Sequence, residues 1–247
     1  MNPVLNVAVR DVIESIKTKR LLVTLFIFVF IGIGTAHWVR YLLMSSPTGD
    51  EQFIKDAMAN SFLNNLRNFL ALLSILFGAD AINREIETGT IRVTLGHPIY
   101  RDQFLIGKFL GKALTVMVGL TLFVVISVAS MLLIGIPIGG GVVMLILKPL
   151  PFFVLFSLVY VSLGVLLSVL VRKSSTSILL ALLLALFLEM IYPIAISVII
   201  SLKVISTGMS PELLGEMIQR MYRFLIIQPG FYLKNIWYAF GMRYFTV

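Results

Sequence analysis

The chain has 247 residues, of which 59% are hydrophobic and 13% are charged. Soluble domains average about 45–50% and about 25% for these two classes. A single water-soluble core cannot hide that much apolar surface, because cores stop growing at about 250–300 residues and still keep a polar shell. The composition therefore excludes a soluble enzyme and predicts that the lipid bilayer is the solvent of this chain.

The scarcity of Cys and His and the net charge exclude several further classes of protein. The sequence has no cysteine, which excludes a disulfide framework and any Cys-ligated zinc or iron–sulfur site. Its two histidines, His37 and His97, leave little for a His-based centre, so we expect no metal site. The net charge of +8 suggests either nucleic-acid binding or a basic cytoplasmic face. For a membrane protein the basic face is favoured, with no nucleic-acid partner.

Residues 1–20 predict an amphipathic helix on the cytoplasmic membrane surface. Five apolar residues recur there at helical spacing, while three charged residues take the other face. A cleavable signal peptide is the alternative, but the next apolar run is too long and no small-residue cleavage pattern follows. The apolar positions are Leu5, Val9, Val12, Ile13 and Ile16, and the charged positions are Arg10, Glu14 and Lys17.

Residues 21–202 predict a transmembrane domain of five helices, since about 20 apolar residues cross the hydrocarbon core. We therefore expect an all-α membrane protein, a polytopic helical bundle with an N-terminal amphipathic surface helix. Small residues four apart, at Gly32 and Ala36 and at Gly164 and Ser168, favour close helix packing. A tight turn is expected at Pro137 and residues 139–141. The predicted spans are 21–43, 61–82, 109–136, 152–171 and 176–202.

Two of these spans contain polar side chains that would be unfavourable in lipid. Those of the second span should face protein or a water-filled path, unless they mark a solvated helix end. In the fifth span, interrupted by Glu189 and Pro193, the Glu189 carboxylate could line a transport path or trigger helix movement. A structural role, protonated or bonded to a neighbouring helix, is favoured for it. These pathway candidates are Asn64, Asn65, Arg67, Asn68 and Glu189.

The distribution of Lys and Arg predicts the orientation. Alternate connections carry eleven of them on one side and four on the other, before the tail. The positive-inside rule therefore places the N-terminus in the cytoplasm of a multi-pass protein, which we expect in the plasma membrane. The eleven are Arg10, Lys17, Lys19, Arg20, Arg84, Arg92, Arg101, Lys108, Lys112, Arg172 and Lys173, and the four are Arg40, Lys55, Arg67 and Lys148.

Residues 203–247 differ from the spans. Ser210-Pro211-Glu212 is a helix start signal, and Pro229-Gly230 breaks the apolar face that follows. Nine of the chain's 28 aromatic residues lie between Tyr222 and Phe245, which is typical of helices at the membrane interface. With no further run of 18 apolar residues, we expect an outer interfacial helical segment and no sixth span.

The connection after the second span, about residues 84–104, contains a spaced motif. It resembles the first cytoplasmic loop of type-2 permeases of ATP-binding-cassette (ABC) transporters. In that family a Glu-rich helix end precedes Gly-Thr-Leu, apolar residues, a Pro, an Arg and Leu-Gly-Lys. Here Ile91 replaces the Leu, and His97-Pro98 stands where Ser-Pro is commoner. The matching features are Glu85 and Glu87, Gly89-Thr90-Ile91, Leu95, Pro98, Arg101 and Ile106-Gly107-Lys108.

The resemblance implies that this loop is a coupling helix, seated in a groove of a separate ATPase subunit. It also implies a second permease copy or homologue, alternating access and export. Arg101 and Lys108 would then pin the next span at the anionic inner leaflet. The chain lacks G-x-x-x-x-G-K-[ST], so ATP and Mg²⁺ are expected on the partner and no cofactor on this chain. The implied coupling residues are Glu85, Glu87, Gly89, Thr90, Ile91, Arg92, Leu95, Pro98 and Arg101.

Other interpretations remain open. The loop could be an ordinary charged turn. Glu85, Glu87 and Asp102 could also be acid–base or metal-binding groups, but no His or third carboxylate stands nearby at ligand spacing. The whole chain could be a membrane-embedded enzyme, although its spans offer only Glu189 as a catalytic group. It could also be a non-transporting membrane assembly factor. Co-elution with an ATPase favours the permease, and turnover by the isolated chain favours the enzyme.

Overall fold

The computed structural model describes residues 3–17, 20–45, 51–90, 100–136, 140–207 and 227–233, and these contain helices and no strand. The expected all-α bundle is therefore confirmed. In chain order the helices are α1 (Pro3–Lys17), α2 (Arg20–Ser45), α3 (Glu51–Ala79), α4 (Asn83–Glu87), α6 (Arg101–Leu133), α7 (Gly140–Leu147), α8 (Leu150–Leu170), α9 (Ser174–Leu186), the π-helix η1 (Phe187–Ile191) and α10 (Tyr192–Thr207).

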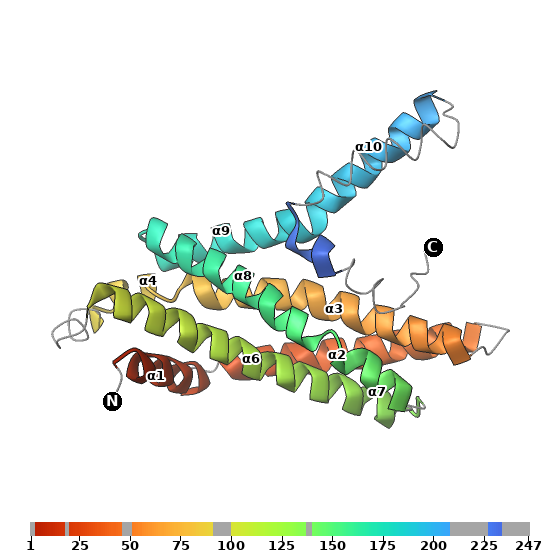
Figure 1. The fold of residues 1–247 in the computed structure, drawn as a ribbon, viewed down its shortest axis with the longest axis horizontal. Coiled ribbons are helices and arrows are strands. Elements are labelled where there is room, and N and C mark those ends of the chain that lie inside the picture. The colour runs from red at the N-terminus through yellow and green to blue at the C-terminus, as the bar shows by residue number, and fades with distance from the viewer. Residues whose placement is uncertain are drawn as a thin grey trace.

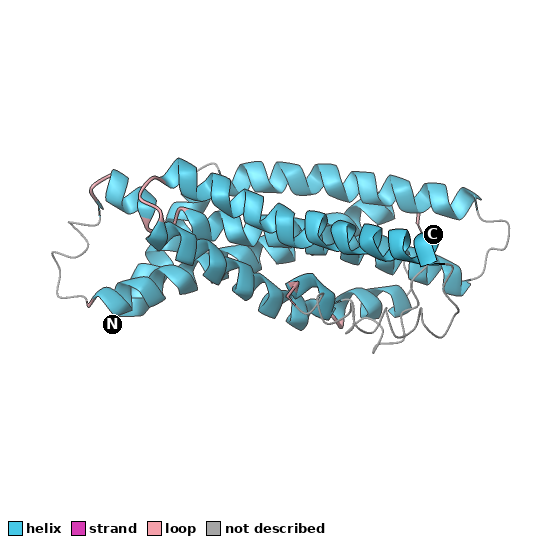
Figure 2. Ribbon diagram, turned by 90° about the horizontal axis from the view of Figure 1, so that it is seen from above, coloured by secondary structure: helices cyan, strands magenta, loops and turns pink. Residues whose placement is uncertain are grey.

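The helix α3 lies at the centre of the bundle. It contacts α2, α6, α7, α8 and α9. The long helices α2, α3 and α6 run side by side, α8 crosses them, and α10 leaves the bundle at an angle (Figures 1 and 2). This arrangement makes α3 the element through which the other helices are joined.

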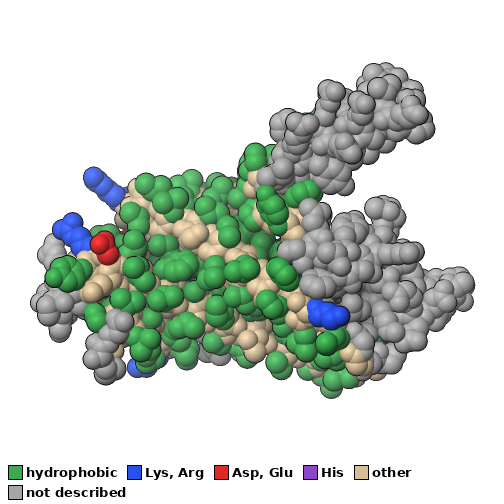
Figure 3. All heavy atoms as spheres, viewed as in Figure 1, with side chains coloured by type: hydrophobic (Ala, Val, Ile, Leu, Met, Phe, Trp, Pro, Cys, Tyr) green, Lys and Arg blue, Asp and Glu red, His purple; other side chains and the backbone are tan. Residues whose placement is uncertain are grey.

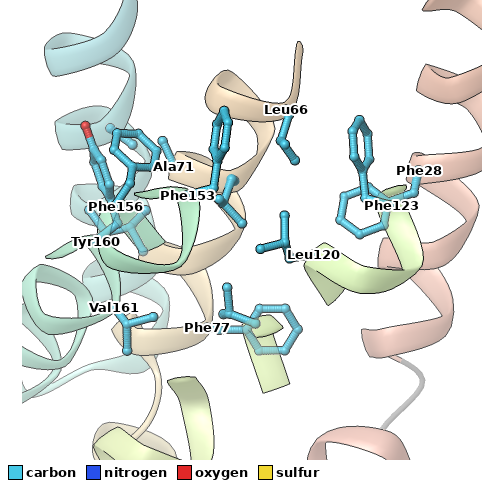
Figure 4. Close-up of a cluster of buried hydrophobic side chains, with 14 of the residues drawn as sticks. Phe28, Leu66, Ala71, Phe77, Leu120, Phe123, Phe153, Phe156, Tyr160 and Val161 are labelled. Carbon is cyan, nitrogen blue, oxygen red and sulfur yellow. The ribbon is translucent and has the colours of Figure 1, made fainter. Parts of the chain in front are cut away.

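An apolar core fills the space between α2, α3, α6 and α8 (Figure 4). The rings of Phe28 and Phe123 meet edge to face with centroids 5.0 Å apart, and Phe62 lies 5.7 Å from Phe123. On the α8 side, the rings of Phe156 and Tyr160 lie 4.9 Å apart. Aromatic pairs at these separations add stabilisation beyond the area that they bury.

Glycine allows α3 and α8 to approach backbone to backbone. A Cβ atom added to Gly164 would lie 2.9 Å from the Ala79 nitrogen and 2.9 Å from the Gly78 Cα. A Cβ on Gly32 would lie 3.2 Å from the Ser130 hydroxyl of α6. The predicted close packing at Gly32 and Gly164 is confirmed, whereas Gly78 was not predicted to take part.

Three helical stretches in the described part of the chain are long and apolar enough to cross a membrane. They are Arg101–Leu133, Leu150–Leu170 and Ser174–Ile199, and they match the third, fourth and fifth predicted spans. A shorter apolar stretch, Phe26–Leu42, belongs to the first. The second predicted span, 61–82, covers the second half of α3 and the turn that follows it.

The exterior of the bundle suits lipid. Apolar side chains cover the middle of the face shown in Figure 3, while Lys and Arg side chains lie near its two ends. Large apolar side chains such as Phe26, Phe30 and Leu133 are 73%, 77% and 87% exposed. Apolar groups in such numbers are stable on the outside only where the surroundings are themselves apolar.

Several predicted boundaries are wrong. Gly140 and Gly141, expected in a tight turn, instead lie in α7, which begins at Gly140, and the chain turns at Gly135 with a φ of +79°. The helix α6 begins at Arg101, before the predicted start of the third span, and α10 continues past residue 202 to Thr207. The fifth span departs from the α-helix at η1, which contains Glu189 as predicted, whereas Pro193 lies within α10. Residues 137–139, 208–226 and 234–247 lie outside the described residues.

Candidate functional site

One end of the bundle collects the segments that were predicted to share the cytoplasmic side. There α1 packs against α6, and α4 contacts the start of α9 (Figure 1). The turn between α8 and α9 carries the exposed residues Arg172 and Lys173 to the same end. The structure thus brings these basic segments together. Their position in the cytoplasm stays a prediction.

The segment after α3 is a turn followed by the short helix α4. Past α4, Gly89 has a φ of +72° in the left-handed region, as expected for a turn at this glycine. The Thr88 hydroxyl donates a hydrogen bond to the Arg84 carbonyl at 2.8 Å. Ile86 remains 51% exposed at this end. The predicted coupling residues Ile91, Arg92, Leu95 and Pro98 lie outside the described residues.

Serine hydroxyls hold the start of α4 against α8 and α9. The Ser168 hydroxyl oxygen accepts hydrogen bonds from the Ile82 and Asn83 backbone N–H groups at 2.9 and 3.1 Å. The Ser177 hydroxyl donates to the Ala79 carbonyl at 2.7 Å. These bonds satisfy backbone groups that a helix end would otherwise leave unpaired. Sequence reasoning treated Ser168 only as a small residue, since its hydrogen-bond partners are remote in the chain.

Glu87 also joins α4 to α9. Its carboxylate accepts a hydrogen bond from the Ser174 backbone N–H at 2.8 Å. Ser174 is the first residue of α9, where an anion interacts favourably with the free N–H groups and the helix dipole. The contact therefore joins α4 to the turn between α8 and α9.

A buried ionic network joins α1, α4 and α6. Asp11 of α1 lies 2.7 Å from the Lys108 ammonium and 3.2 Å from that of Lys112. Lys108 also forms an ion pair with Glu85 of α4. Lys108 is 5% exposed and Asp11 is 2% exposed. The expected contact of Lys108 with anionic lipid is therefore wrong, because its ammonium is turned into the protein and paired with carboxylates.

Two glycines of α6 make room for α1. A Cβ atom added to Gly107 would lie 2.7 Å from the Val7 Cβ, and one added to Gly111 would lie 3.0 Å from the Ala8 carbonyl oxygen. This close approach of α1 and α6 lets Asp11 reach Lys108 and Lys112. The predicted apolar face of α1 points away from α6. Val12 is half-buried, and the other four residues of that face are exposed: Leu5, Val9, Ile13 and Ile16.

The pathway candidates Arg67 and Glu189 form a single buried site. Glu189 lies in η1, and its carboxylate accepts hydrogen bonds from the Tyr160 hydroxyl at 2.5 Å, the Gln228 amide at 3.2 Å and the Gly230 N–H at 3.2 Å. The Arg67 Nε atom lies 3.5 Å from the same carboxylate. The structure thus agrees with the interpretation that Glu189 is bonded to neighbouring helices.

The asparagines near Arg67 lie on its own helix. The Asn65 amide donates to the Thr35 hydroxyl of α2 at 2.8 Å, so it faces protein as expected. Arg67 donates to the Asn68 side-chain oxygen at 3.3 and 3.2 Å. Asn64 is half-buried. The cluster is therefore part of the helix packing around α3.

Fold and site together define a multi-pass helical membrane protein with a short helix at its basic end. A profile of the family described as "ABC-2 family transporter protein" matches residues 5–232, and the chain belongs to this family. The resemblance drawn from the loop after the second span is thereby confirmed. Membership in a transporter family also agrees with the expectation that the chain is not itself an enzyme.

Two curated relatives are similar to part of the chain. Both are named "Probable ABC transporter permease protein NosY". The relative from Stutzerimonas stutzeri is 32% identical over 124 residues, which are 48% of this chain and 43% of the relative. The relative from Pseudomonas aeruginosa (strain PAO1) is 30% identical over 115 residues, which are 46% and 40%. The matched part of the chain thus spans less than half the length of each relative.

Proposed function

We propose that this chain is the membrane-spanning permease subunit of an ATP-driven ABC transporter, with export as its direction. The observation that carries the proposal is the short helix α4, which ends in a glycine turn at the basic end of the bundle. The family match and the similarity to proteins named as ABC permeases support it. ATP and Mg²⁺ would bind to a separate ATPase subunit, and a second permease copy or homologue would complete the transporter.

The proposed coupling segment runs from about residue 84 to residue 104. Ile86 is exposed there and is suited to an apolar contact with the ATPase. Glu85 and Glu87 would position the segment, since one pairs with Lys108 and the other accepts the Ser174 N–H. A displacement of α4 would therefore reach α6 and α1 through the ionic network, and α8 and α9 through the serine hydroxyls. The resulting movement of these helices would drive alternating access.

The proposed arrangement in the plasma membrane places α1 and α4 in the cytoplasm. Residues 1–20 would then be the surface helix, with the exposed face of Leu5, Val9, Ile13 and Ile16 toward lipid. Residues 21–202 would form the transmembrane domain and residues 203–247 the outer interfacial segment. Residues 227–233 are the exception in that segment, because Gln228 and Gly230 bond to Glu189 in the middle of the fifth predicted span and so lie deeper than the interface.

Replacing Gly89 with valine is expected to weaken ATPase binding roughly tenfold. No atom of the described residues would lie within 4 Å of an added Cβ, so the effect is expected from the backbone conformation. An L-residue in the left-handed region is strained by about 1–2 kcal/mol, and a β-branched side chain resists it most. The measurement is the amount of ATPase subunit, recognised by its G-x-x-x-x-G-K-[ST] motif, that co-purifies with the tagged chain.

Gly89→Asn is the matched control, because asparagine adopts the left-handed conformation more readily than other side chains. We expect this variant to retain most of the bound ATPase and its ATP turnover. If the valine variant binds the ATPase and transports at the unmodified rate, the segment is an ordinary charged turn. If the isolated chain turns over a substrate without an ATPase, the permease proposal itself fails.

A further inference from the structure

The fifth predicted span changes its surroundings at η1. Before it, α9 packs against α3 and α8, whereas α10 has its main contact within the described residues with η1 itself. Figure 1 shows α10 turning away from the bundle at this point. A π-helical turn holds one residue more than an α-helical turn, and such turns are frequent at functional sites. The π-helix is therefore the natural position for a hinge in this span.

The Glu189 carboxylate connects that hinge to three other segments. Arg67 comes from α3, Tyr160 from α8, and Gln228 and Gly230 from the described part of the tail. Glu189, Arg67 and Gln228 are 5%, 6% and 2% exposed, so water competes little for these bonds. Gly230 brings its backbone N–H to the carboxylate, and an added Cβ atom would lie only 3.0 Å from the Glu189 Cδ.

The hinge is also mechanically linked to the α4 end. The first turn of α9 is fixed by the bonds from Ser174 to Glu87 and from Ser177 to Ala79. From Ser174 to Glu189 the helix extends roughly 22 Å at 1.5 Å per residue. A tilt of α9 at its bonded end would therefore displace Glu189 relative to Arg67 and Tyr160, which belong to α3 and α8.

We propose that Glu189 is the clamp of a hinge in the fifth span, and that its ion pair with Arg67 holds α10 and residues 227–233 in the arrangement seen here. Opening the clamp frees α10 to reorient while α9 stays packed against α3. The use of this hinge in a transport cycle rests on the proposed function. The clamp itself is a property of the chain alone.

Spin-label distances in the full chain in lipid nanodiscs test the clamp. The sequence has no cysteine, so spin labels attach only at cysteines that are introduced in pairs. One pair, Val159→Cys with Ile199→Cys, joins exposed positions of α8 and α10 across the hinge. The reference pair, Val159→Cys with Leu179→Cys, joins α8 to α9 before the hinge. With Glu189→Gln or Arg67→Gln, we expect a broadened and shifted distribution for the first pair and an unchanged one for the second.

Two further variants sharpen the test. Ser197→Ala is the matched control, because Ser197 lies exposed on α10 and its hydroxyl donates to the Ile194 carbonyl of the same helix. It should leave both distributions unchanged. The double variant Arg67→Gln with Glu189→Gln should shift the first pair no further than either single variant, since both act on one contact.

An unchanged distribution for the α8–α10 pair in both single variants overturns the clamp. Equal broadening of both pairs also overturns it, because Arg67 and Glu189 would then support the whole bundle rather than the hinge. The measurement uses no ATPase. The spin-label result can therefore contradict the clamp while the chain still co-purifies with an ATPase. Equally, a chain that binds no ATPase can still give the distances expected for the clamp.

Discussion

Replacing Gly164 with alanine is expected to lower the free energy of unfolding by about 3 kcal/mol, the upper end of the range for overpacking. The added Cβ would lie 2.9 Å from both the Ala79 nitrogen and the Gly78 Cα. These are backbone atoms of α3, so no side chain can rotate away and the two helices must separate. The measurement is thermal unfolding of the purified chain in detergent.

Gly34→Ala is the control for this substitution. Gly34 lies in α2, and no atom in the described part of the chain would lie within 4 Å of its added Cβ. Alanine is favoured over glycine inside a helix by about 1 kcal/mol, so this variant should be as stable as the unmodified chain or more so. Equal melting temperatures for Gly164→Ala and Gly34→Ala would contradict the backbone contact between α3 and α8.

Replacing Asp11 with alanine is expected to detach α1 from α6. The substitution leaves the Lys112 ammonium without its carboxylate and the Lys108 ammonium with Glu85 as its remaining ion-pair partner. Removing one member of a buried ion pair is unfavourable by about 3–5 kcal/mol, because the remaining charge is uncompensated. Amide hydrogen exchange of residues 3–17 measures the detachment directly, since those N–H groups lose protection when the helix is released.

Lys17→Gln is the matched control, since this residue also lies on α1 and is exposed. Its loss should leave exchange in α1 unchanged, because exposed charges contribute little. Full protection of α1 in Asp11→Ala would show that the helix is held by apolar contacts such as Val7 against Gly107, and not by the ionic network.

The membrane class and most helices were predictable because they depend on local composition. A run of apolar residues about as long as the bilayer is thick identifies a span without any knowledge of its partners. Gly89 was predictable as a turn for a similar reason, since glycine favours the left-handed conformation by itself. The family resemblance was likewise carried by a short, contiguous motif.

The contacts of the site were not predictable in the same way, because each joins residues far apart in the chain. Arg67 and Glu189 stood out separately as polar residues in predicted spans, and nothing in the sequence pairs them. Asp11 was unremarkable until α1 was seen to place it against Lys108 and Lys112. Hydrophobic periodicity indicates which face of a helix is apolar but not which helix packs against the other face.

Photo-crosslinking from α4 tests whether this helix contacts a separate ATPase subunit. A photoreactive amino acid at Ile86 would lie at the proposed ATPase contact, and one at Met44 would lie at the far end of α2. Both positions are well exposed, so access to the probe is comparable. We predict a crosslinked polypeptide with the G-x-x-x-x-G-K-[ST] motif from Ile86 and none from Met44. Crosslinks to that polypeptide from Met44, or from neither position, would contradict it.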